Sequence, residues 1–327
     1  MPEGQALLTI TRSCINRGNL IIEHAAWRVL GFGPPAVVID AHEPLDRRDA
    51  EAASRCQVTV LPGATLLQPG DHPAVERLDW ISSPLLAIGA ALRSLDGAAD
   101  LSVARSIQNR QTTIGSRDPF THDALTRAGI PSRLVGCPTL LLGTAEGWLP
   151  RPGPIVFSAG LGPQEPLAQC ARACAEAGPL VQLLHAPERQ PAFWEGPGVE
   201  SVPLTSAEQA FALIRSASAV VTSRMHAFLA ALVFGVPAFF LGGWDDSRYS
   251  LLEYLGVPLE PPTPKRVREL LSGLERGRLP VDACFERAET LRQGMRAWLA
   301  EMREEGVLPE PEPLAQALPV GPAGAEV

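Results

Sequence analysis

The stretch AVVTSRMHAFLAALVFGVP, residues 219–237, decides how this chain folds. It opens with a run of small and β-branched apolar residues, which is typical of a buried strand. Thr222 and Ser223 end that run, and a strongly apolar helical segment follows from Arg224. Gly235 and Pro237 then close the helix. The stretch predicts a buried strand, a turn and a buried helix, with polar side chains gathered at the turn.

Arg224 and His226 stand at the amino end of this predicted helix. Unpaired backbone N–H groups and the helix dipole favour an anion there. An arginine can hold a carboxylate or a phosphate through two parallel hydrogen bonds, and a histidine carries a proton near neutral pH. We therefore predict an anion site. Simple capping of the helix is the alternative that this stretch alone leaves open.

Composition sets the class of protein. The chain has 327 residues and a formal net charge of −8, so its bulk charge argues against a general nucleic-acid binder. No basic segment of a secretory signal precedes the first apolar run. We expect a cytoplasmic protein, with peripheral association to membrane glycan-assembly machinery as a further possibility for its partners.

Cysteines and histidines give no metal signature. Cys170 and Cys174 lie four residues apart on a predicted helix, but no further ligands follow at metal-site spacing. We interpret both as small buried hydrophobic residues and expect neither a metal ion nor a cofactor. The histidines outside the opening stretch are interpreted as ordinary surface or core residues: His24, His42, His72, His122 and His185. His185 ends a predicted strand and is the first of them to inspect.

Two series of apolar strands and helices follow one another along the chain. Strands are predicted at 6–11, 36–40, 57–61, 85–90, 133–135, 154–159, 180–185, 219–223 and 238–241. Helices are predicted at 20–30, 121–128, 165–177, 206–218 and 281–305, while 114–120 is predicted as a loop and 143–153 as a linker. Continuous apolar strands alternating with helices indicate parallel sheets covered on both faces.

This order predicts an α/β fold of two Rossmann-like domains that face each other across a cleft, with a long C-terminal helix. We place the first domain at 1–150, the second at 151–306 and a disordered tail at 307–327. Ligands of such sheets bind at the carboxyl ends of the strands.

Several motifs, taken in order, resemble the polysaccharide pyruvyltransferase family. Asn16-Arg17-Gly18-Asn19 is similar to the family's N-x-G-D, and Arg117-Asp118 precedes a helix. Gly136-Cys137-Pro138-Thr139 follows the next strand. Ser223-Arg224-Met225-His226-Ala227 is similar to the family's R-[LM]-H-A, and Asp246-Ser247-Arg248 leads into the segment 251–256.

The resemblance implies a GT-B-like fold and a transferase that moves pyruvate from phosphoenolpyruvate to sugar hydroxyls, forming a ketal on a glycan or a glycan precursor. It implies that the second domain carries the donor site and the first the acceptor side. The Arg and His of the family's R-[LM]-H motif map onto Arg224 and His226, which we predict to be catalytic. We further predict donor-binding roles for Arg117, Ser223, Met225 and Arg248, and acceptor-binding roles for Asn16 and Asn19.

Three positions depart from the family pattern. Asn19 stands where an aspartate is usual, Pro62-Gly63-Ala64 where the family is glycine-rich, and Arg248 where a lysine is common. An amide at position 19 removes any acid role there but keeps a hydrogen bond to a sugar possible. Two other functions therefore stay open: a nucleotide-sugar glycosyltransferase on the same fold, and a degenerate, non-catalytic glycan-binding member.

Overall fold

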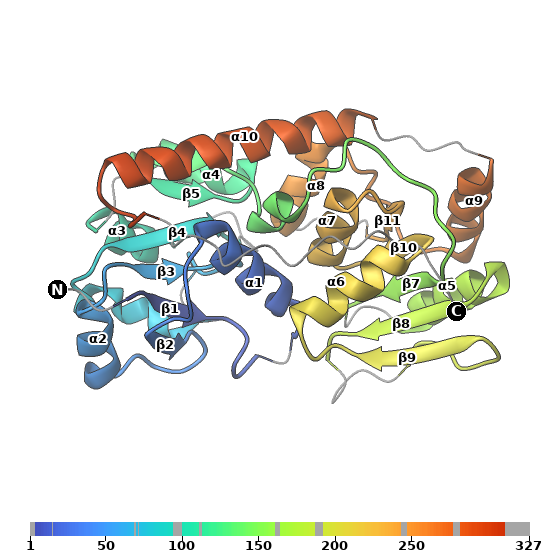
Figure 1. The fold of residues 1–327 in the computed structure, drawn as a ribbon, viewed down its shortest axis with the longest axis horizontal. Helices are drawn as coiled ribbons and strands as arrows, with labels where there is room; N and C mark the ends of the chain where they lie inside the picture. The colour runs from blue at the N-terminus through green and yellow to red at the C-terminus, as the bar shows by residue number, and fades with distance from the viewer. Residues whose placement is uncertain are drawn as a thin grey trace.

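The computed structural model describes residues 4–14, 16–68, 70, 72–93, 100–110, 113–160, 164–186, 192–242, 247–276 and 282–310. These residues form two parallel sheets and the helices that cover them (Figure 1). The predicted α/β class with parallel sheets is confirmed. Within the described residues, no helix is both long enough and apolar enough to cross a membrane.

The first sheet has six parallel strands in the order β2-β1-β3-β4-β5-β6. Its strands are β1 (Ala6–Thr9), β2 (Val37–Asp40), β3 (Thr59–Leu61), β4 (Leu85–Ala90), β5 (Ile114–Ser116) and β6 (Ser132–Leu134). The elements between them are α1 (Asn19–Leu30), α2 (Arg47–Ser54), the 3-10 helix η1 (Pro73–Trp80), α3 (Ser102–Gln108), α4 (Pro119–Arg127) and, after β6, η2 (Pro138–Leu142).

The second sheet has five parallel strands in the order β11-β10-β7-β8-β9. Its strands are β7 (Ile155–Ser158), β8 (Leu180–Leu184), β9 (Val199–Pro203), β10 (Ala219–Thr222) and β11 (Ala238–Phe240). Its helices are α5 (Gln164–Ala177), α6 (Ala207–Ser216), α7 (Met225–Val233), η3 (Ser247–Tyr249), α8 (Ser250–Leu255), α9 (Pro264–Glu275) and α10 (Asp282–Glu304).

Both sheets reverse their strand order once, and these reversals position the site. In the first sheet the chain proceeds to either side of β1, with β2 on one side and β3 on the other. In the second sheet β8 and β10 flank β7 in the same way. A crevice opens at the carboxyl ends of the strands at such a reversal. The fold therefore offers two crevices, one beside β1 and one beside β7.

Helix α10 packs on the first sheet although it follows the second sheet in the sequence. Trp298 and Met295 are fully buried against Val60 and Leu86 of β3 and β4. Trp298 also covers β5, because a Cβ added to Gly115 would lie 2.8 Å from its ring. Figure 1 shows α10 running along the first half of the molecule above β5 and α4. The amphipathic helix predicted at 281–305 is confirmed.

One expectation from the sequence was wrong. Residues 114–116 form strand β5 rather than a loop, a three-residue strand with a glycine at its centre that leaves little pattern to detect. Within the tail predicted at 307–327, Leu308 is buried beside α10 and its backbone N–H donates to the Met302 carbonyl. Residues 311–327 lie outside the described residues.

The proposed domain boundary near residue 150 falls between the two sheets. The last strand of the first sheet ends at Leu134 and the first strand of the second begins at Ile155. The predicted linker, 143–153, contains no helix or strand. Helix α10 comes after the second sheet in sequence but packs on the first sheet, so the two halves of the chain do not each pack only on their own sheet. The division of the chain at 150 therefore stays a proposal.

Gly89 brings β4 against the Gly136-Cys137-Pro138 segment. Gly89 has a φ of +65° at the register shift between Ile88 and Ala90. A Cβ there would lie 2.6 Å from Pro138 Cδ and 2.8 Å from the Gly136 carbonyl oxygen. Only glycine fits both the backbone and the contact.

We expect Gly89→Ala to lower the free energy of unfolding by at least about 2 kcal/mol, since it combines backbone strain with overpacking. Urea unfolding followed by circular dichroism measures this. Gly129→Ala is the matched control, because Gly129 has a φ of +70° but an added Cβ would meet nothing within 4 Å. Equal losses in the two variants would contradict the packing part of this prediction.

Candidate active site

The carboxyl ends of strands from both sheets line one cavity of about 360 Å³, which we call the central cavity. Its volume is at the small end of the range for ligand sites. Its lining residues are Cys14, Asn16, Gly18, Asn19, His42, Ala64, Thr65, His72, Arg93, Arg117, His185, Ser223, Arg224, Met225, His226 and Tyr249. Three of them are arginines, four are histidines, and none of these described lining residues is an aspartate or glutamate.

The turn between β10 and α7 is held by its two hydroxyl residues. Thr222 Oγ1 donates to the Ser158 carbonyl at 2.5 Å and accepts from the Arg224 backbone N–H at 2.8 Å. Ser223 Oγ accepts from the Gly160 N–H at 2.9 Å. These bonds fix the position of the helix start, so that Arg224 is the N-cap residue of α7. The first backbone N–H groups of α7 have no acceptor within the helix and face the same end of the sheet.

Arg224 joins the two walls of the cavity. Its Nε donates to the Ala159 carbonyl at 3.3 Å, at the end of β7. Its Nη1 donates to Asn16 Oδ1 at 3.2 Å, across 208 positions of sequence. One side chain of the second sheet is therefore oriented by the loop that follows β1.

Arg117 reaches the cavity from the end of β5. Its side chain is almost completely buried, and its Nε pairs with Asp118 Oδ2 at 3.0 Å. Asp118 also caps α4 by accepting from the Thr121 N–H at 2.9 Å. Arg117 Nη2 is buried and has no hydrogen-bond partner among the described residues. A buried, unsatisfied guanidinium nitrogen at a cavity wall is the donor that a bound anion would satisfy.

His226 lies between positive charges. It is partly exposed to the cavity, but its Nε2 atom is buried and lacks a hydrogen-bond partner in the described part of the chain. Burial, followed by the charges of Arg117 and Arg224, lowers the pKa of His226 to about 3. The imidazole is therefore neutral at physiological pH while the cavity holds no anion.

A titration of the free protein checks this protonation state. We expect the Cε1 proton signal of His226 to keep its neutral shift from pH 8 down to pH 5, because a pKa of about 3 lies well below that window. Histidine NMR spectra recorded across this range measure it, with His226→Gln used to assign the signal. A titration midpoint near the ordinary value of about 6.5 would contradict the prediction.

His185 is a second buried histidine of the cavity wall. Its side chain is fully buried, and Nε2 lies 2.6 Å from Ser158 Oγ. Its Nδ1 has no partner among the described residues. Burial, with the charges of Arg224 and His226, holds its pKa well below the ordinary value. Position at the end of β8 made it the histidine to inspect first, and the structure places it in the site.

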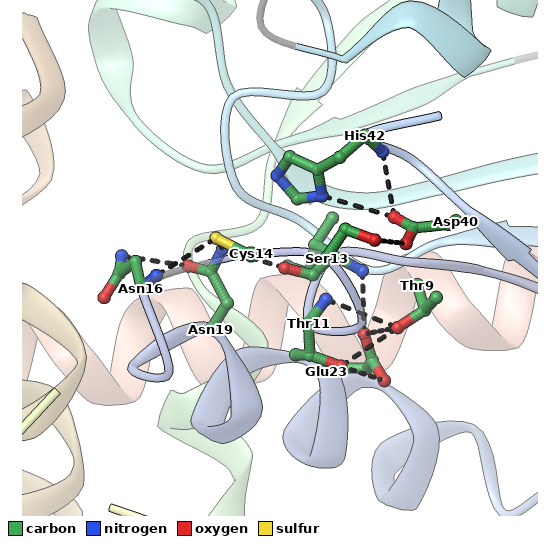
Figure 2. A network of polar contacts seen from close by, with 10 residues as sticks. Thr9, Thr11, Ser13, Cys14, Asn16, Asn19, Glu23, Asp40 and His42 are labelled. Carbon is green, nitrogen blue, oxygen red and sulfur yellow. Dashed lines mark hydrogen bonds and ion pairs between the residues drawn. The ribbon is translucent and has the colours of Figure 1, made fainter. Parts of the chain in front are cut away.

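The predicted acceptor residues shape the loop after β1. Asn19 Nδ2 donates to the Ile10 carbonyl at 3.1 Å, and Asn19 Oδ1 accepts from Asn16 Nδ2 at 3.3 Å. Cys14 Sγ lies within hydrogen-bond distance of both side-chain and backbone donors of this loop, as Figure 2 shows. Asn16 and Asn19 both line the central cavity, so a contact to a ligand is compatible with their role in the loop.

The remaining predicted site residues differ in where the structure places them. Ser223 and Met225 line the central cavity beside Arg224. The backbone of Arg248 belongs to η3, but its side chain lies outside the described residues.

At the Pro62-Gly63-Ala64 departure, Gly63 has a φ of +101° and Ala64 a φ of +56°. Ala64 keeps a left-handed conformation that costs about 1–2 kcal/mol for a residue with a Cβ, which gives a physical reason for a glycine-rich segment there.

Sequence reasoning missed several lining residues. His42 follows β2 and Arg93 follows β4, while His72, Thr65 and Tyr249 come from loops or short helices. The sequence predicts His42 and His72 to be ordinary surface or core histidines, whereas both line the central cavity. The signal that could have found His42 and Arg93 is their place within three residues of a strand's carboxyl end. His72 carries no such signal.

Comparison with known proteins gives the class of this fold. The structure is similar to UDP-GlcNAc 2-epimerase from Methanocaldococcus jannaschii, with a TM-score of 0.56 and 13% identity, over 91% of this chain and 99% of that one. It is also similar to UDP-GlcNAc 2-epimerase from Neisseria meningitidis, with a TM-score of 0.55 and 9% identity, over 92% and 99% of the two chains. The protein therefore has a GT-B-like fold, as predicted.

The particular family follows from the sequence. A profile of the polysaccharide pyruvyl transferase family matches residues 16–245. The chain belongs to that family, and the predicted resemblance is confirmed. A search of curated protein sequences finds no match. The matched residues include every lining residue of the central cavity from Asn16 to His226.

Proposed function

We propose that this protein transfers pyruvate from phosphoenolpyruvate to a pair of sugar hydroxyls, releasing phosphate and forming a ketal. The observation that carries the proposal is the central cavity, which combines Arg93, Arg117 and Arg224 with no carboxylate among its described lining residues. Phosphoenolpyruvate carries a carboxylate and a phosphate, together about two to three negative charges at neutral pH. Three guanidinium groups, of which Arg117 is already paired with Asp118, give the cavity an excess of positive charge that suits such an anion. The small cavity suits a small donor.

The wall beside α7 holds the donor in this proposal, with Arg224 and Arg117 as the clamp. Arg117 Nη2 gains the hydrogen-bond acceptor that it lacks in the free site. Backbone N–H groups at the start of α7 bind further oxygens of the same anion. The loop after β1, with Asn16 and Asn19, forms the acceptor side.

His226 is the proton carrier of the donor wall. In the free site burial acts against its protonation, followed by the charges of Arg117 and Arg224. A bound polyanion offsets both positive charges and so raises the pKa of His226 toward a value at which it holds a proton. His226 then protonates the methylene carbon of the enol while a sugar oxygen bonds to the central carbon. The phosphate leaves that carbon, and the second hydroxyl closes the ketal.

Incubation with phosphoenolpyruvate and a panel of glycans tests the proposal. We expect phosphate release that depends on one acceptor and a matching mass increase of that acceptor by one pyruvate ketal. A thermal-shift series with phosphoenolpyruvate and nucleotide sugars runs beside it. Stabilisation by nucleotide sugars alone, with no phosphate release from phosphoenolpyruvate, would replace this proposal with a glycosyltransferase. Stabilisation by glycans alone would leave a binding protein without this activity.

A further inference from the structure

His42 lines the central cavity, and Asp40, which does not line it, lies beside His42. Asp40 is the last residue of β2, and His42 follows it two positions later. The His42 backbone N–H donates to Asp40 Oδ1 at 3.0 Å, and His42 Nδ1 lies 3.4 Å from the same oxygen, a contact that is not a hydrogen bond among the described residues. Ser13 Oγ donates to Asp40 Oδ2 at 2.5 Å. Figure 2 shows the three side chains in this arrangement.

These contacts keep Asp40 ionised and set the orientation of the His42 ring. Although burial acts to raise it, the pKa of Asp40 is lowered because the Ser13 hydroxyl and the His42 backbone N–H donate to the carboxylate and the His42 ring lies beside it. A carboxylate facing Nδ1 favours the tautomer with the proton on Nδ1, which leaves the lone pair on Nε2. Nε2 is on the ring edge turned away from Asp40 (Figure 2). His42 lines the cavity with about 20% of its side chain exposed.

The ring of His72 packs against the ring of His42. The two imidazole rings meet edge to face, with centroids 4.9 Å apart at 67°. The His72 residue is only 5% exposed, so of the two histidines His42 presents the larger surface to the cavity. Asp40 and His72 together therefore fix the ring of His42 without covering it.

The reaction requires a proton acceptor on the acceptor side. Ketal formation moves a proton onto the donor's methylene carbon and removes one from each sugar hydroxyl. Asn19 holds the position where the family has an aspartate, and an amide cannot accept a proton. Its Nδ2 and Oδ1 are already bonded to Ile10 and Asn16. In the proposed function His226 protonates the enol carbon on the donor wall, so it does not serve as the base for the acceptor.

We propose that His42 is the general base for the acceptor hydroxyl and that Asp40 is its positioning residue, an inference that rests on the proposed function. The hydroxyl oxygen bonds to the central carbon of phosphoenolpyruvate, and its proton passes to His42 Nε2. The enol electron pair takes a proton at the methylene carbon from His226. The carbon–oxygen bond to phosphate then breaks, and the phosphate leaves with that bonding pair. The second hydroxyl oxygen then bonds to the same carbon and closes the ketal, and its proton passes to the released phosphate. His42 returns its proton to the solvent, from which His226 is reprotonated.

Three variants of the full-length protein test the assignment: His42→Gln, Asp40→Asn and His42→Ala. We expect His42→Gln to lower kcat for acceptor-dependent phosphate release about a hundredfold, within the usual range for a general base, with the KM for phosphoenolpyruvate unchanged within about threefold. Asp40→Asn should lower kcat about tenfold. Free imidazole should restore part of the activity of His42→Ala, which a merely structural role would not allow.

His122→Gln is the matched control. His122 lies on α4 beside Ser132, 3.2 Å from its hydroxyl, and does not line the central cavity. The assignment is overturned if His42→Gln keeps the activity of His122→Gln, or if its loss appears as a higher KM for phosphoenolpyruvate and imidazole restores nothing. Both outcomes presuppose an active wild type. A wild type that releases no phosphate with any acceptor overturns the proposed function itself, and this assignment with it.

Discussion

Replacing His226 with glutamine should lower kcat about a thousandfold, within the range for a group that transfers a proton in the rate-limiting step. Glutamine keeps a polar side chain at this position but cannot carry a proton. The dissociation constant for phosphoenolpyruvate should stay within about threefold, because Arg117 and Arg224 supply the charge that holds the donor. Steady-state phosphate release gives kcat, and calorimetric titration with phosphoenolpyruvate gives the dissociation constant.

His24→Gln is the control for this experiment. His24 is also partly buried with a lowered pKa, but it pairs with Glu208 at 3.1 Å and lies outside the central cavity. A His226→Gln variant with the turnover of His24→Gln would remove His226 from the chemistry. A loss confined to donor affinity would make it a binding residue only.

Arg224 should dominate donor binding. We expect Arg224→Gln to raise the KM for phosphoenolpyruvate at least a hundredfold, because loss of a charge-assisted hydrogen-bond pair in a desolvated site costs about 3 kcal/mol. Arg224→Lys should lose about tenfold, since it keeps the charge but not the planar fork. Steady-state kinetics across donor concentrations at fixed ionic strength measure both.

Arg215→Gln is the surface control for this series. Arg215 lies over the Phe234 ring at 4.2 Å and does not line the cavity. Equal donor KM values for Arg224→Lys and the wild type would show that position 224 acts through charge alone. Equal values for Arg224→Gln and Arg215→Gln would place the donor elsewhere in the molecule.

Most of the cavity wall beside α7 could be predicted from the sequence because its signal is local. The strand, the hydroxyl turn and the helix at 219–237 are continuous in sequence, and Arg224 and His226 sit where parallel strands place their ligands. Their environment is not local. The low pKa of His226 comes first from burial and then from Arg117, which is more than a hundred positions away. No periodicity of the sequence indicates that the ends of β5 and β10 meet.

The cavity residues from the first sheet were harder to predict, because their signal is not local in the sequence either. His42 follows a predicted strand, yet a single histidine beside an aspartate has no spacing that separates it from a surface loop. Asn19 was recognised from its motif, but the structure was needed to show that its amide is bonded to Ile10 and Asn16. Short strands such as β5, and the half-exposed edge strand β9, carry too few residues of regular pattern to be found from sequence.

The path of helix α10 sets a rule for recombining this protein with its relatives. Near its start, Arg287 donates to the Tyr254 carbonyl at 2.7 Å, and near its end Glu301 pairs with Arg133 of β6. Between these points Trp298 fills the core of the first sheet. A hybrid that exchanges residues 1–150 alone would set a foreign sheet against this tryptophan. Crossovers on both sides of the second sheet, near 150 and again before Asp282, would let each first sheet keep the helix that evolved with it.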